Sequence, residues 1–109
     1  MKVAGYVPDL MDRSKLAAAV PGVEFVANPR LLVEVEADVV VLDLSRPGVI
    51  EALSALAHVR TVGFGSHVDV ETLQAATAAG CDVVLARSAF FGRLPGVLDE
   101  GRSAKMADS

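Results

Sequence analysis

The sequence predicts an α/β fold in which helices cover both faces of a parallel β-sheet. Short Val-rich runs alternate with Ala- and Leu-rich runs of helical spacing, and the short connections carry Gly, Pro, Asn or Asp. Residues 39–42 are apolar without alternation, which indicates a strand buried on both faces. These two observations predict strand-helix units with right-handed crossovers, and hence a three-layer α/β/α sandwich.

The first strand and the first helix have clear ends. The strand over residues 2–7 stops at Pro8, because proline has no amide hydrogen to donate to a strand ladder. Asp9 is the predicted N-cap of a helix over residues 10–20, which a Pro-Gly pair ends. The second strand follows over residues 23–27.

The middle of the chain repeats this alternation. Asn28 is a capping residue directly before a proline, so a brief helix is expected over residues 30–36. The buried strand over residues 39–42 has Asp43 at its carboxyl end. A helix with one apolar stripe is then predicted over residues 49–57.

The last part of the chain completes the sheet. A fourth strand over residues 60–64 leads to a helix that Asp69 caps and that Gly80 ends in a left-handed conformation. Residues 83–86 are the fifth strand, and a short helix begins around Ser88. Phe90, Phe91, Leu94 and Leu98 are expected to be mostly core residues. Residues 1–100 are predicted to form the domain, and residues 101–109 a flexible C-terminal tail without periodicity.

Composition limits the class of protein. The 109 residues suit one domain, and the 52% hydrophobic content excludes a disordered chain. The net charge of −4 argues against nucleic acid or anionic lipid as a partner. No apolar run reaches the roughly 20 residues of a membrane span. The N-terminus lacks the apolar core of a secretory signal.

The cysteine content indicates a reducing compartment. The lone Cys81 excludes an internal disulfide and a multi-Cys zinc site. We therefore expect a cytoplasmic protein in which Cys81 is a small buried filler rather than a nucleophile.

Polar residues that follow the predicted strands mark the candidate site. In doubly wound sheets, ligands bind beyond the carboxyl ends of the strands. The residues placed at this edge are Asp9, Asp43, Ser66, His67 and Arg87.

The chain resembles the CheY-like receiver domain of response regulators over roughly residues 2–98. Residues 39–47, VVVLDLSRP, are similar to the family's apolar strand, phospho-accepting Asp and downstream Pro. Residues 79–87 are similar to its Ala-Gly-Ala segment and the following strand, which ends in an essential Lys. The resemblance implies a flavodoxin-like five-stranded parallel sheet of order 2-1-3-4-5, with Asp43 as the phosphoacceptor candidate.

The chain departs from the family at the predicted metal site. Receivers carry two adjacent acids after the first strand, and this chain has Pro8 and Asp9. Asp9 and Asp43 are therefore the remaining candidate ligands for a possible magnesium ion.

The expected phosphate contacts also differ. Gly65 occupies the position of the family's hydroxyl residue, with Ser66 one residue later, and Arg87 replaces the Lys. A planar guanidinium keeps the charge but does not reproduce a compact ammonium. Ser88 stands at the family's cis-Pro position. His67, in the turn after the fourth strand, is a candidate phosphate or pH sensor.

These departures predict a degenerate receiver, or pseudo-receiver, that is not an enzyme. It is expected to act as a stand-alone regulatory module by binding a protein partner or forming a homodimer. The predicted contact face is formed by the helix that Asp69 caps, the strand over residues 83–86 and the helix that begins around Ser88. Asp43 is expected to be phosphorylated poorly or not at all.

Two other functions stay open. One is a functional Mg-dependent phosphoacceptor of a two-component system, and the other is a small-ligand or anion-binding α/β protein that uses Ser66, His67 and Asp43. Simpler structural roles also stay open. In these alternatives, Asp43 only caps the next turn or pairs with Arg87, and Asp9 is only an N-cap. Arg87 is then a structural counter-ion to Asp43 or Asp9, and His67 is a solvated turn residue.

Overall fold

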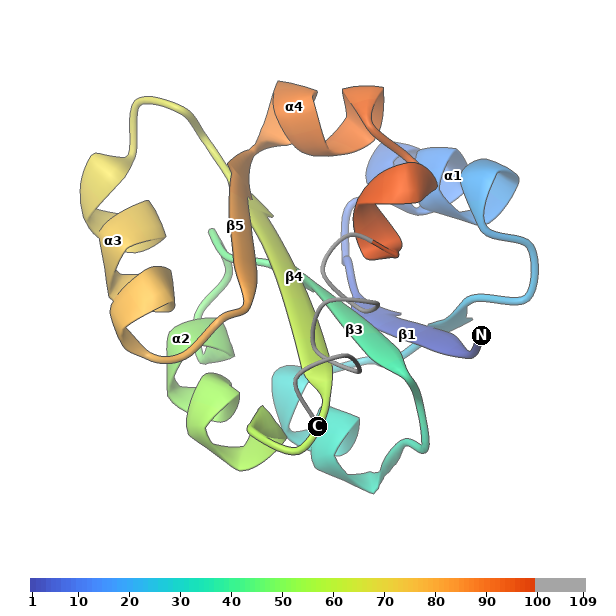
Figure 1. Cartoon of the computed structure of the whole chain (residues 1–109), viewed down its shortest axis with the longest axis horizontal. Helices are drawn as coiled ribbons and strands as arrows, with labels where there is room; N and C mark the ends of the chain where they lie inside the picture. The colour runs from blue at the N-terminus through green and yellow to red at the C-terminus, as the bar shows by residue number, and fades with distance from the viewer. Residues whose placement is uncertain (100–109) are drawn as a thin grey trace.

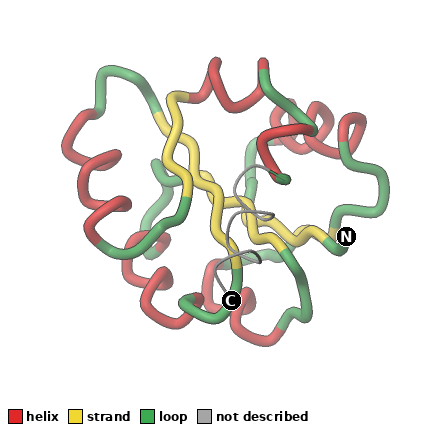
Figure 2. The backbone as a smooth tube through the Cα atoms, in the orientation of Figure 1, coloured by secondary structure: helices red, strands yellow, loops and turns green. Residues whose placement is uncertain are grey.

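A computed structural model describes residues 1–99 and shows a five-stranded parallel sheet between two layers of helices (Figures 1 and 2). The strand order is β2-β1-β3-β4-β5, and every neighbouring pair is parallel. The strands are β1 (Val3–Tyr6), β2 (Glu24–Phe25), β3 (Val39–Asp43), β4 (Arg60–Gly65) and β5 (Val83–Ala86). The predicted fold class and strand order are confirmed.

Helical segments connect the strands. The α-helices are α1 (Leu10–Ala19), α2 (Val49–Ala52), α3 (Val70–Ala78) and α4 (Arg87–Gly92). The 3-10 helices are η1 (Pro29–Glu34), η2 (Leu53–Leu56) and η3 (Gly96–Leu98). One core lies between the sheet and α1, α4 and η3, and the other lies between the sheet and the remaining helices. Figure 1 shows α1 and α4 on the side of the sheet opposite α2.

β3 lies at the centre of both cores. All five of its residues are buried. Val39 and Val41 pack into the core under α1 and α4, whereas Val40 and Leu42 pack into the other. Because both faces of this strand are covered, the apolar run without alternation is explained.

The predicted helix boundaries hold where a capping group fixes them. Asp9 Oδ1 accepts the N–H of Asp12 at 3.0 Å, and Asp69 Oδ1 accepts the N–H of Thr72 at 3.2 Å. Gly80 has the expected positive φ of 101°. A residue with no Cβ adopts this left-handed conformation without strain.

Several elements are shorter than predicted. β1 has four residues instead of the six in 2–7. β2 has two residues instead of the five in 23–27, because it is an edge strand with only β1 as a partner. The brief helix predicted over 30–36 is the 3-10 helix η1, which Asn28 caps through the N–H of Arg30 at 3.1 Å. The helix over 49–57 is one α-helical turn that tightens into η2, a frequent ending of short helices.

The elements at the C-terminal end of the described residues are also short. α4 begins one residue before Ser88 and ends at Gly92, and η3 follows. Phe90 and Leu98 are fully buried, while Phe91 and Leu94 are partly buried against the same core.

Cys81 is buried as predicted. The predicted domain end at residue 100 and the tail over 101–109 lie outside the described residues. No helix within residues 1–99 has both the length and the apolar character that a bilayer crossing requires.

Candidate functional site

A cavity of about 290 Å³ lies at the carboxyl edge of β3, β4 and β5. It is lined by Asp43, Ser45, Phe64, Gly65, Ser66, His67, Arg87 and Ser88. The structure therefore brings together the predicted residues Asp43, Gly65, Ser66, His67 and Arg87. Of the predicted site residues, Asp9 is the one that does not line this cavity.

Asp43 is held by the turn that follows it. Its side chain is 6% exposed, and Oδ1 accepts both the N–H of Ser45 at 3.1 Å and the Ser45 hydroxyl at 2.6 Å. Oδ2 accepts the Nε–H of Arg46 at 3.3 Å. An Asp at the end of a strand often bonds the backbone two residues on in this way. The carboxylate of Asp43 thus has hydrogen bonds and a counter-ion from its own loop.

Arg87 is paired with Asp12, which corrects the expected pairing with Asp43 or Asp9. Its two terminal nitrogens donate to the two carboxylate oxygens of Asp12. The Asp12 side chain is fully buried, whereas that of Arg87 is about half exposed. The hydrogen bond with Asp12 is the main reason that the pKa of Arg87 is raised, and burial opposes it. A bidentate pair of this kind fixes the orientation of both side chains.

Asp12 was not among the predicted site residues, although its place in the helix carries a signal for it. Asp12 lies four residues before Leu16, so both side chains lie on the same face of α1. Leu16 belongs to the buried apolar stripe of that helix. A carboxylate on such a stripe needs a cation or several donors. The cation comes from the beginning of α4, far away in the sequence.

Arg87 also contacts a cluster of three aromatic rings. The rings of Phe64 and Phe90 are stacked with centroids 4.8 Å apart, and Phe91 meets both edge-on. The guanidinium carbon of Arg87 lies 5.4 Å from the centroid of the Phe91 ring. This packing fixes α4 against β4 and adds a cation–π contact to the ion pair.

Asp9 acts as the N-cap of α1. The hydrogen bond from the Asp12 N–H is the largest cause of its lowered pKa, and the charges of Arg87 and Arg46 lower it further. Within residues 1–99, no group of three or more acidic, His or Cys side chains is placed to hold a metal ion. Asp9 and Asp43 remain the candidate magnesium ligands, and both already accept hydrogen bonds.

Ser66 and His67 are exposed residues of the turn after β4. Gly65 is the last residue of β4 and pairs with Ala86, so the hydroxyl of Ser66 comes one position beyond the strand. That hydroxyl accepts the N–H of Val68 at 3.4 Å. The cavity therefore has exposed hydroxyl and imidazole groups on one side and Arg87 on another.

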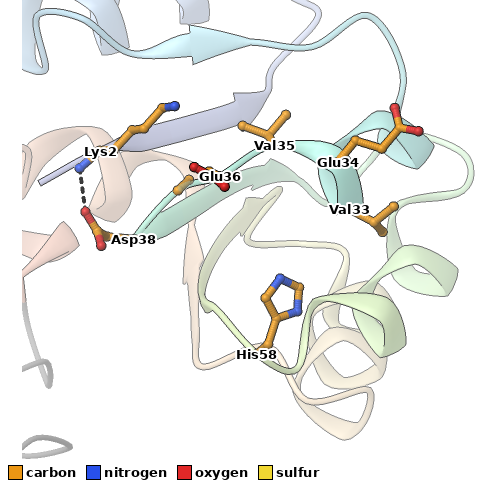
Figure 3. A pocket seen from close by; sticks show the side chains of 8 residues that line it. Lys2, Val33, Glu34, Val35, Glu36, Asp38 and His58 are labelled. Atoms are coloured by element: carbon orange, nitrogen blue, oxygen red, sulfur yellow. Dashed lines mark hydrogen bonds between the residues drawn. The ribbon is translucent and has the colours of Figure 1, made fainter.

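A larger cavity of about 480 Å³ lies at the opposite, amino edge of the sheet (Figure 3). Its charged and imidazole side chains belong to Lys2, Glu34, Glu36, Asp38 and His58. All of these residues are exposed, and the backbone N–H of Lys2 donates to Asp38 at 2.7 Å. Solvated charges of this kind are typical of an ordinary surface, so the carboxyl edge is the better candidate for chemistry.

Comparisons with known proteins identify the fold. No protein-family model and no curated protein sequence matches the chain. Among solved structures, a response regulator from Hahella chejuensis superposes with a TM-score of 0.75 and 20% identity, over 90% of this chain and 92% of that one. The beryllofluoride-activated DrrB receiver domain gives a TM-score of 0.72 and 18% identity, over 91% and 97% of the two chains.

This chain has the fold of a response-regulator receiver domain. The beryllofluoride-activated NtrC4 receiver domain, described as a dimer, is also similar, with a TM-score of 0.69 and 15% identity over 91% of this chain and 97% of that one. At this level of identity the likeness establishes the receiver fold. What this receiver-fold chain does must be argued from its own residues.

Proposed function

We propose that this receiver-fold domain is a regulatory module that acts by protein–protein contact, with weak or absent phosphorylation at Asp43. The observation that carries the proposal is the bidentate pair between Arg87 and the buried Asp12. Phosphoryl transfer to a carboxylate brings two anions together, which requires a free cation and usually a metal ion. Here Asp12 already neutralises Arg87.

The state of Asp43 supports the same proposal. Its Oδ1 carries two hydrogen bonds from Ser45, and its Oδ2 contacts Arg46. A phosphoryl donor would have to displace these contacts. Because magnesium prefers several oxygen ligands, the replacement of one acid by Pro8 weakens the metal site further.

The proposed contact face is formed by α3, β5 and α4. β5 is an edge strand, and all four of its residues are only partly buried. A mainly apolar groove of about 430 Å³ lies beside it, lined by Val70, Leu73, Gln74, Thr77, Ala78 and Val84. An exposed apolar groove next to a strand edge favours a protein partner or a second copy of the chain.

Phosphorylation can be tested with a small-molecule donor. We expect no stoichiometric modification of Asp43 when the purified chain is incubated with magnesium and acetyl phosphate and analysed by intact mass. The matched variant P8D/R87K restores the second acid and the ammonium, and it should gain binding of a beryllofluoride mimic in ¹⁹F NMR. Stoichiometric modification of Asp43 in the wild type would contradict the proposal and favour the Mg-dependent phosphoacceptor.

The third candidate is an anion-binding protein, which the lining of the Asp43 cavity favours. Ser45, Ser66, His67 and Ser88 offer hydroxyl and imidazole groups beside Arg87. A rise in melting temperature with inorganic phosphate that H67A and S66A abolish would support this function. If phosphate has no effect beyond that of chloride at equal ionic strength, this candidate is excluded.

A further inference from the structure

The two charged residues that line the Asp43 cavity are each paired with a residue outside its lining. Asp43 Oδ2 accepts the Nε–H of Arg46 at 3.3 Å, and two nitrogens of Arg87 donate to the carboxylate of Asp12. Neither Arg46 nor Asp12 lines the cavity. The cavity therefore presents Arg87 to a ligand, but the charge of Arg87 is already balanced by a residue that the ligand does not contact.

The two members of the Asp12–Arg87 pair differ in their contact with solvent. The side chain of Asp12 is 0% exposed, whereas that of Arg87 is 45% exposed and lines the cavity. A half-exposed guanidinium can bind an anion that enters from solvent, but a fully buried carboxylate cannot follow it. Arg87 is thus the member that an anion can reach, and Asp12 is the fixed anion that already holds it.

The rest of the lining suits a small anion such as phosphate. Ser66, His67 and Ser88 are exposed, and their hydroxyl and imidazole groups can donate hydrogen bonds to phosphate oxygens. Arg87 is the permanent cation of this lining, because arginine keeps its proton in proteins. Hydrogen bonds from a guanidinium to a charged acceptor are the strong ones, so the affinity of the cavity for an anion depends mainly on Arg87.

We propose that Asp12 is a built-in competitor for Arg87 and keeps the anion affinity of the Asp43 cavity low. The proposal rests on the anion-binding candidate described above and adds what regulates it. An anion gains the full charge and fork of Arg87 only at the expense of Asp12, whose buried carboxylate is costly to leave without a cation. Neutralising Asp12 therefore converts the cavity into a tighter anion site.

The test titrates inorganic phosphate into the full chain without magnesium, with chloride keeping the ionic strength constant. Binding is followed in ¹H–¹⁵N spectra, which include the Arg87 Nε–H resonance. D12N should bind phosphate about tenfold more tightly than the wild type, because the guanidinium no longer has a charged partner within the protein. D12N/R87M should lose this gain.

D9N is the matched control for the loss of a negative charge. The hydrogen bond with Asp12 is the main cause of the raised pKa of Arg87, whereas Asp9 contributes only its charge. D9N should therefore raise the phosphate affinity by less than about twofold, because a charge without direct contact is screened by solvent and salt.

The neutral variants are expected to fold, because Arg87 is half exposed and water solvates it when Asp12 loses its charge. D12S is a second neutral variant with a smaller side chain, and circular dichroism checks the fold of both. A folded neutral variant that binds phosphate no more tightly than D9N overturns the proposal, as does a gain that persists in D12N/R87M. Either result leaves the acetyl phosphate test of Asp43 unaffected, so the two proposals fail separately. Equally tight binding by the wild type and D12N also overturns the competitor role, although it supports the anion-binding candidate.

Discussion

The two edges of the sheet differ in whether their buried charged side chains have partners. At the carboxyl edge, Arg87 is neutralised by Asp12 and Asp43 is neutralised by Arg46. At the amino edge, the buried Arg60 has two nitrogens without an acceptor among residues 1–99. At the edge where receiver-like chemistry is expected, the charged groups are therefore already paired with one another, whereas the other edge holds a buried guanidinium with two nitrogens that make no hydrogen bond.

Removing the cation from the satisfied edge should have the largest effect. R87M leaves the carboxylate of Asp12 buried without its counter-ion, which should lower the free energy of unfolding by about 3 kcal/mol. Urea unfolding measures this loss. The matched control R46M breaks the partly exposed pair with Asp43 and should cost less than about 1 kcal/mol.

A second substitution tests whether the charge of Asp12 causes that loss. D12N/R87M removes both charges and should recover part of the stability that R87M loses. If R87M and R46M cost the same, or if D12N/R87M recovers nothing, the Asp12–Arg87 pair does not differ from a surface pair and the comparison of the two edges fails.

Removing the cation from the other edge should have the opposite sign. R60M replaces a buried guanidinium, whose Nε and Nη2 make no hydrogen bond, with an apolar side chain and should raise the free energy of unfolding by about 2 kcal/mol. Chemical denaturation in chloride buffer measures the change, with R30M as the control. A loss of stability in R60M would show that Arg60 is paired in the folded chain, and the two edges would then be alike.

A hydrogen-bonded contact between a side chain and the backbone at the amino edge should matter less. Asp82 accepts the N–H of Thr61 at 2.9 Å, and the Thr61 hydroxyl accepts the N–H of Asp82 at 3.0 Å. D82A should lower the free energy of unfolding by about 1 to 2 kcal/mol, because the buried Thr61 N–H loses its acceptor. D82N keeps an acceptor oxygen and should cost less in the same measurement. Equal costs for the two variants would show that the acceptor role is not what Asp82 contributes.

The fold was predictable because its signals are local. The apolar run over residues 39–42 required burial on both faces, and β3 packs into both cores. Asp9, Asp69 and Gly80 marked helix ends through side-chain capping and backbone conformation. Elements without such signals, such as β2, were predicted too long.

The site was predictable only in part, because its pairings are between distant residues. Strand ends correctly grouped Asp43, Ser66, His67 and Arg87 around one cavity. The partner of Arg87 lies 75 residues earlier in the chain, and no spacing rule connects the two. The buried stripe of α1 indicated that Asp12 needs a cation, but it did not indicate which one. Nothing in the sequence around Arg60 distinguishes it from an exposed strand residue, because its burial depends on packing between distant elements.

Acid titration at Asp9 should give the smallest effect and separates its charge from its capping role. Its pKa is lowered from 3.8, chiefly by the hydrogen bond from the Asp12 N–H. A lowered folded-state pKa stabilises the fold at pH values above the unfolded pKa, and this contribution is lost as the pH falls through the folded pKa. D9N keeps a capping oxygen without the charge, so it should lose less stability than the wild type between about pH 4 and pH 2.

The measurement is urea unfolding across that range, together with an NMR titration of the Asp9 carboxyl carbon. D9A is the matched control, because it removes the cap at every pH and should lower stability even at neutral pH. If the wild type and D9N lose stability in parallel as the pH falls, the charge of Asp9 contributes nothing at this edge. Asp9 would then be a cap alone, and the neutralisation of the carboxyl edge would rest entirely on Asp12, Arg87, Asp43 and Arg46.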